Sequence, residues 1–172
     1  MRMNLDLANA QAAAAAAEGE PSGHRLQFIS FRVDDQEFAI DIISVREIKG
    51  WTETTTLPNQ QEYLLGVLNL RGTIVPIYDL RCRFGMGLTT ATRSHVVIIV
   101  SVRERTIGLL VDAVSDILTV NSNDIRPVPE MDRTIRTDYL KGLISVGESM
   151  VVLLSLETLF SPQSLNDASF AA

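Results

Sequence analysis

The sequence predicts a mainly β protein made of two small barrels with short helices. Two observations support this prediction. Short apolar segments alternate with tight turns, and the whole order of segments occurs twice: residues 28–48 reappear 69 positions later, and residues 63–84 reappear 76 positions later. Because the repeated positions are mostly apolar and turn residues, a folding unit has been duplicated. Each copy has about 60 to 70 residues, where one core is marginal, so the copies should pack on each other.

The first copy begins with two strands and a short turn. From Arg25 onward, Ile29, Phe31 and Val33 alternate with polar residues, as in a half-buried strand. Asp34 and the following aspartate form the turn, and residues 38–42 alternate again as the next strand. A short segment at 45–48 and an extended connection at 51–58 follow.

The first copy ends with a hairpin and a helix. Strands are predicted at 67–70 and 73–78, joined by Arg71 and Gly72. Asp79 is a suitable N-cap for a short helix that ends near Phe84.

The second copy repeats this order with one longer connection. Its predicted strands are 96–102, 107–111 and segments near Leu118, Leu143 and Val151, and its helix is 156–160. The connection from Ile48 to Tyr63 spans 15 positions, whereas that from Ile117 to Tyr139 spans 22. The predicted organisation is one combined domain with an alanine-rich flexible tail at 1–24, a first barrel at 25–88, a second barrel at 93–160 and a C-terminal tail at 161–172.

Composition excludes several classes of protein. A net charge of −6, without any Lys/Arg run longer than two, argues against nucleic-acid binding. One cysteine and two histidines predict no internal disulfide, no metal site and no cofactor, and they suit a reducing compartment. No apolar stretch is long enough to span a membrane, and Asp6 interrupts any signal-peptide core near the start. We therefore expect a soluble, cytoplasmic protein.

Sequence signatures of common enzymes are also absent. The chain has no G-x-S-x-G elbow, no phosphate-binding G-x-x-x-x-G-K-[ST] loop and no H-E-x-x-H helix, and His95 is expected at a strand edge. Carboxylates at element ends leave hydrolytic chemistry as a weak alternative to capping and solubility roles: Asp41, Glu47, Asp79, Asp112 and Asp116. Cys82, between Arg81 and Arg83, is either an activated thiol or a buried one. The sequence predicts that the protein is not an enzyme.

The two copies differ most informatively at one turn. The first has Arg71-Gly72 where the second has Gly147-Glu148, so the turn is kept while the arginine is lost. Only one barrel is thus expected to carry a charged contact surface near Val45 and Glu47.

Taken together, the motifs resemble one family. They are FAIDI at 38–42, VREI at 45–48, GVLNLRG at 66–72, IVPI at 74–77, DL at 79–80, GLLVD at 108–112, VSD at 114–116 and IRP at 125–127. Their number and order, from Leu26 to Phe160, are similar to the bacterial chemotaxis coupling proteins of the CheW family. This resemblance implies two five-stranded SH3-like barrels around a shared hydrophobic seam.

The resemblance also implies a function and its partners. Family members are non-catalytic adaptors that couple methyl-accepting chemotaxis receptors to the regulatory domain of the histidine kinase CheA, in cytoplasmic arrays beneath the inner membrane. Matched by motif, the receptor-binding residues would be Val45, Glu47, Gly66, Arg71, Val96 and Ile117. The kinase-binding residues would be Ile48, Ile74 and Ile77 with Met131 in the longer connection.

Two other functions remain open at this point. The chain could be a detached regulatory domain of such a kinase or the coupling part of a two-domain adaptor, but it has no ATP-binding or phosphoacceptor segment. A double barrel that binds a small ligand belongs to a different class. Stabilisation of the fold by a ligand would favour that reading.

Overall fold

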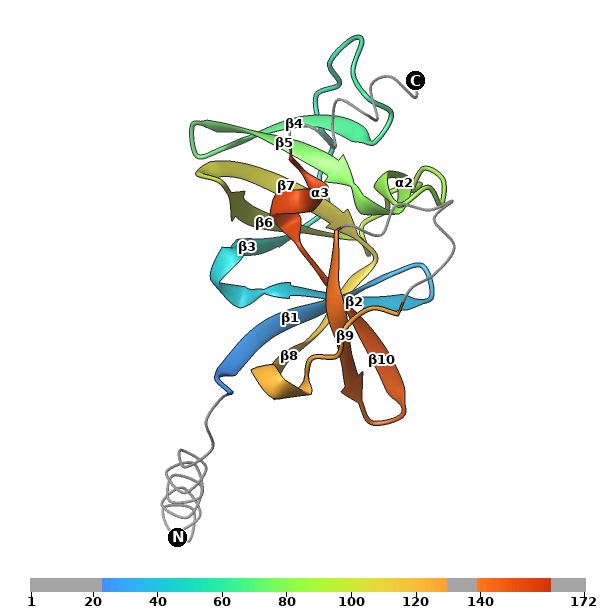
Figure 1. Ribbon diagram of the computed structural model, residues 1–172. Helices are drawn as coiled ribbons and strands as arrows, with labels where there is room; N and C mark the ends of the chain where they lie inside the picture. The colour runs from blue at the N-terminus through green and yellow to red at the C-terminus, as the bar shows by residue number, and fades with distance from the viewer. Residues whose placement is uncertain (1–22, 130–138, 162–172) are drawn as a thin grey trace, which may run out of the picture.

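The computed structural model describes residues 23–129 and 139–161, and they form two five-stranded barrels stacked one above the other (Figure 1). Barrel A has the strand order β8-β1-β2-β10-β9, and barrel B has the order β3-β6-β7-β5-β4. The strands of barrel A are β1 (Arg25–Val33), β2 (Gln36–Asp41), β8 (Ala113–Asn121), β9 (Leu140–Val146) and β10 (Ser149–Leu154). Those of barrel B are β3 (Val45–Gly50), β4 (Leu64–Leu70), β5 (Thr73–Asp79), β6 (Val96–Val102) and β7 (Arg105–Val111). The short helices are η1 (Ile42–Ser44), α2 (Leu80–Arg83), η2 (Ser122–Asp124) and α3 (Leu156–Leu159).

Each barrel takes strands from both copies of the repeat, which corrects the predicted division into 25–88 and 93–160. The first hairpin of the first copy, β1–β2, lies in barrel A, where β2 pairs in parallel with β10. The first hairpin of the second copy, β6–β7, lies in barrel B, where β7 pairs in parallel with β5. The copies have therefore exchanged their first hairpins. Equivalent strands have similar apolar patterns, and so strand periodicity does not specify this pairing.

Each barrel is closed by one pair of residues at equivalent places. In barrel B, the segment after β3 meets β4 through the Thr55–Val67 bridge. In barrel A, the segment after β8 meets β9 through the Arg126–Leu143 bridge. A closed barrel leaves no long unpaired edge, which limits pairing with other chains.

Three apolar clusters fill the molecule. The largest lies between the barrels and includes Phe31, Ile98, Leu109 and the two equivalent tyrosines, Tyr63 and Tyr139. Smaller clusters fill the interiors of barrel A and barrel B. The expectation that the two copies share a core is confirmed.

Local sequence signals explain the turns and helices. Arg71 and Gly72 have φ angles of 52° and 90°, as the tight hairpin turn between β4 and β5 requires. The Asp79 side chain accepts a hydrogen bond from the Arg81 amide at the start of α2, so the predicted N-cap is confirmed. Ser155 occupies the equivalent position before α3. The predicted tails at 1–24 and 161–172 lie almost entirely outside the described residues.

Candidate functional site

An ion pair joins two of the predicted receptor-facing residues in barrel B. The Arg71 guanidinium, on the β4–β5 turn, donates to the Glu47 carboxylate on β3 over 2.6 Å. The side chain of Arg71 is 72% exposed and that of Glu47 is 29% exposed. The two residues are 24 positions apart in the chain, and barrel closure brings them together.

The pair lies in a surface groove. The groove is lined by Arg46, Glu47, Leu70, Arg71, Thr73, Val75, Ile99 and Thr106. Val75 and Ile99 belong to the buried core of barrel B beneath the groove, and the accessible surface of the groove is mainly polar. Hydrogen bonding by Arg71 holds the pKa of Glu47 below its usual value, and the same bond raises the pKa of Arg71. Both side chains stay charged at neutral pH.

The second copy has no counterpart of this ion pair. Gly147 stands at the turn position equivalent to Arg71, and it cannot supply a charge. Asp116, equivalent to Glu47, is held through its backbone instead, because its amide and carbonyl bond with the Ser30 hydroxyl. The predicted difference between the barrels is therefore present in the described structure.

The remaining predicted receptor-facing side chains are spread over both barrels. Val45, on β3, packs against the core between the barrels, away from Glu47, because a β-bulge separates the two. Val96, on β6, is half-buried against the same core. Ile117, on β8 of barrel A, is 52% exposed. The groove thus gathers only Glu47 and Arg71 of the six predicted residues.

Two predicted contact residues are buried, and their predicted roles need correction. Gly66 is buried on β4, and a side-chain carbon added there would lie 2.4 Å from the Thr55 carbonyl oxygen. Ile77 is completely buried in the core of barrel B, beside Gly108. Neither residue presents an exposed side chain to a partner. Both determine the packing of barrel B, which carries the groove with Glu47 and Arg71.

The other predicted kinase-facing residues are exposed but separate. Ile48 on β3 is 44% exposed and Ile74 on β5 is 60% exposed. Two strands, β6 and β7, lie between β3 and β5 in the sheet. Met131 lies outside the described residues.

Sequence reasoning missed part of the groove. Arg46, Thr73 and Thr106 line it; Arg46 belongs to the VREI motif but is not among the predicted site residues, and the two threonines belong to no motif. Arg46 and Thr73 are direct neighbours of Glu47 and Gly72, and this proximity to the selected residues was the available signal. Thr106 comes from the other copy, through the exchanged hairpin, and no local signal points to it.

The alternative chemistries find little support in the described residues. Asp79 is fully buried, and its carboxylate accepts from the Arg81 amide and from the Thr89 amide and hydroxyl. Burial, with Glu62 and Asp79 nearby, raises the pKa of the Cys82 thiol to about 11, the opposite of activation. Across 23–129 and 139–161, no three His, Cys, Asp or Glu residues are grouped as metal ligands would be. No helix in these ranges is long and apolar enough to cross a membrane.

Comparison with known proteins gives consistent matches over the barrels. A family model described as "CheW-like domain" matches residues 27–163. The chain is 47% identical over 135 residues to a probable chemotaxis protein CheW of Rhizobium etli, covering 78% of this chain and 87% of the relative. It is 40% identical over 147 residues to the chemotaxis protein CheW of Klebsiella aerogenes, covering 86% and 87%. The crystal structure of the scaffolding protein TtCheW from Thermoanaerobacter tengcongensis superposes with a TM-score of 0.74 at 30% identity, covering 82% of this chain and 96% of that one.

Proposed function

Because this chain belongs to the CheW family, we propose that it bridges the cytoplasmic tips of methyl-accepting chemotaxis receptors and the regulatory domain of the histidine kinase CheA. The protein is a non-catalytic scaffold of bacterial chemotaxis that couples receptors to this kinase. It would act in the cytoplasm, at receptor arrays beneath the inner membrane. The match over residues 27–163, which includes both barrels, carries this proposal.

The groove that contains Arg71 is the proposed receptor contact. A guanidinium has five N–H donors, and the bond to Glu47 uses one of them. Glu47 therefore holds Arg71 in one position while most of the side chain stays exposed. Leu70, which is partly exposed in the groove, would bury apolar surface against a receptor helix, and the charged rim would set its register.

The proposed kinase contact uses exposed apolar residues elsewhere on barrel B. Ile48 and Ile74 are both large, apolar and exposed. A partner that covered these side chains would gain the free energy of burying their exposed apolar area. Met131, in the longer connection, is proposed as a second kinase contact.

The decisive experiment reverses the charge of Arg71. Arg71→Glu places a like charge next to Glu47 and removes the donor from the groove rim, so receptor-tip affinity should fall about 30-fold or more. Binding to the kinase regulatory domain should not change. Isothermal calorimetry with each partner separately measures both affinities.

Two further variants sharpen this test. Arg93→Glu makes the same charge change at an exposed residue outside the groove, and it should bind the receptor tip normally. The double variant Glu47→Arg/Arg71→Glu restores the ion pair in reverse. Recovery of binding would mean that the ion pair only orders the groove, whereas continued loss would mean that Arg71 itself contacts the receptor. Normal receptor binding by Arg71→Glu would contradict the proposed site.

A further inference from the structure

The chain crosses between the barrels at two equivalent places. It passes from barrel A to barrel B through η1 (Ile42–Ser44), between β2 and β3. It returns at Asp112, between β7 and β8. Ile43 and Asp112 are equivalent in the repeat, 69 positions apart. The repeat therefore places an isoleucine at one crossing and a carboxylate at the other.

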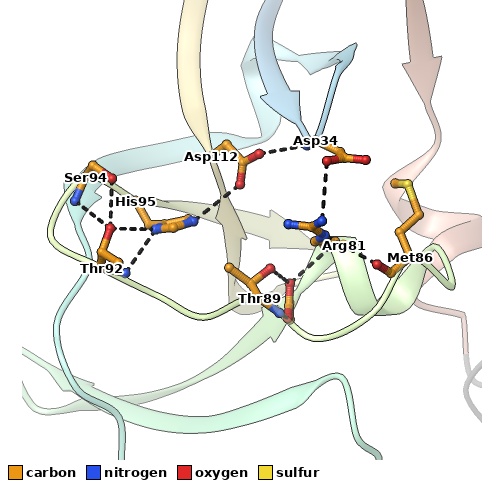
Figure 2. Close-up of polar contacts among 9 residues, drawn as sticks. Asp34, Arg81, Met86, Thr89, Thr92, Ser94, His95 and Asp112 are labelled. Carbon is orange, nitrogen blue, oxygen red and sulfur yellow. Dashed lines mark hydrogen bonds and ion pairs between the residues drawn. The ribbon is translucent and has the colours of Figure 1, made fainter.

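Hydrogen bonds and ion pairs that involve residues of both barrels stabilise the crossing at Asp112 (Figure 2). The Asp112 carboxylate accepts from the Asp34 amide over 2.7 Å and lies 3.4 Å from the His95 imidazole. Arg81, at the start of α2, lies 3.4 Å from the Asp34 carboxylate. Asp34 belongs to the β1–β2 turn of barrel A, whereas His95 and Arg81 adjoin strands of barrel B. These contacts tie the turn of the exchanged hairpin to the neighbouring barrel.

The equivalent contacts are missing at the crossing through η1. Ile43 has no carboxylate and is 78% exposed. The repeat replaces Asp34 by Arg103 and Arg81 by Glu157, so the charges are reversed, yet no ion pair joins these two among the described residues. A groove opens here instead, lined mainly by polar residues: Asp41, Ser44, Ser101, Lys141, Ser155 and Glu157.

We infer that the two barrels are connected by a hinge. The crossing at Asp112 is held fixed by its hydrogen bond and ion pairs (the pinned crossing), and the crossing at Ile43, which lacks these contacts, is flexible (the pliable crossing). Barrel A rotates against barrel B about the pinned side, and the groove between Ser101 and Lys141 widens and narrows. The seam core between the barrels is apolar, so its contacts are non-directional, whereas the hydrogen bond and ion pairs at Asp112 depend on direction and fix the orientation on that side. This motion takes place within the chain and needs no partner.

Distances between spin labels test the hinge in the isolated chain. With Cys82→Ala as background, one label pair is placed at Gln36 and Arg93 beside the pinned crossing, and another at Arg105 and Lys141 beside the pliable one; all four residues are exposed. Double electron–electron resonance should give a distance distribution about twofold broader for the second pair. Equal widths for the two pairs would overturn the inference.

Exchanging the two equivalent residues provides matched variants. Asp112→Ile should broaden the distribution of the pinned pair to that of the pliable pair. Ile43→Asp places a carboxylate at the position equivalent to Asp112 and should narrow the distribution of the pliable pair. Because Ile43 is an exposed residue, this second variant keeps the test decisive even if Asp112→Ile folds poorly. Unchanged widths in Ile43→Asp would overturn the role given to the carboxylate.

Discussion

Gly66 and Gly142 lie at equivalent points of the two barrels, and at each the segment that closes the barrel passes where a side chain would be. A carbon added to Gly66 would lie 2.4 Å from the Thr55 carbonyl oxygen, and one added to Gly142 would lie 2.9 Å from that of Arg126. Each glycine sits next to a bridging residue, Val67 or Leu143. The duplication has therefore preserved the closure of both barrels.

Gly66→Ala should destabilise the protein by about 2 kcal/mol or more, because the φ angle of +147° is strained for other residues and the contact is with backbone. Thermal unfolding measures this loss. Gly50→Ala is the matched control, since nothing lies within 4 Å of its added carbon, and it should change stability by less than about 0.5 kcal/mol. Equal stability of the two variants would mean that the Thr55 backbone shifts away from the added carbon without a cost in free energy.

Ile77→Ala should cost about 2 to 5 kcal/mol of unfolding free energy, because the side chain is fully buried in barrel B. Ile74→Ala, three positions away and 60% exposed, should cost less than about 0.5 kcal/mol. Chemical denaturation compares the two. If Ile74→Ala weakens kinase binding at unchanged stability, its contact role is supported; a loss of binding in Ile77→Ala would be explained by unfolding.

The Glu47–Arg71 pair should make stability depend on pH in one direction. The pKa of Glu47 is lowered from 4.5 in the folded state, chiefly by the hydrogen bond from Arg71. Its contribution is therefore complete above pH 4.5 and is lost as the pH falls through the lowered folded-state value. Nuclear magnetic resonance titration of the Glu47 carboxyl measures this pKa. In Arg71→Gln it should rise toward 4.5, and an unchanged value would show that the bond is absent in solution.

Cys82 should react slowly with thiol reagents. Its pKa is raised from 9.0 to about 11, so the thiolate fraction at neutral pH is roughly 100-fold below that of a free cysteine. Iodoacetamide labelling at pH 7.5, followed by mass spectrometry, measures the rate. Labelling in 6 M guanidinium is the control and should restore the ordinary rate. Equal rates in the two conditions would mean that the thiol is not shielded.

Local features of the fold could be predicted from the sequence, and pairing between distant segments could not. The Arg71–Gly72 turn and the Asp79 cap depend on residues within a few positions, and both are confirmed. The exchange of hairpins depends on which of two similar surfaces each hairpin meets. Because the copies resemble each other, their apolar patterns suit either arrangement.

For the site, too, individual residues could be predicted from the sequence, but the contacts between distant residues could not. Glu47 and Arg71 were both selected by motif, but only the closed barrel shows that they bond to each other. Ile74 and Ile77 were selected together although they are an odd number of positions apart in one strand. Since side chains alternate between the faces of a strand, these two side chains point to opposite faces and cannot belong to one surface. Ile77 falls on the buried face with Val75.

The exchanged hairpins carry a consequence for how such a protein can arise. A chain with one copy of the repeat could build this architecture only as a symmetric homodimer, in which the first hairpin of each chain pairs with strands of the other chain. Symmetry would then force any arginine at the β4–β5 turn to appear twice. Fusion into one chain fixes the pairing and removes that constraint, so Arg71 and Gly147 can occupy equivalent turns of the same molecule. Linkage of the halves thus permits a scaffold with two unlike faces.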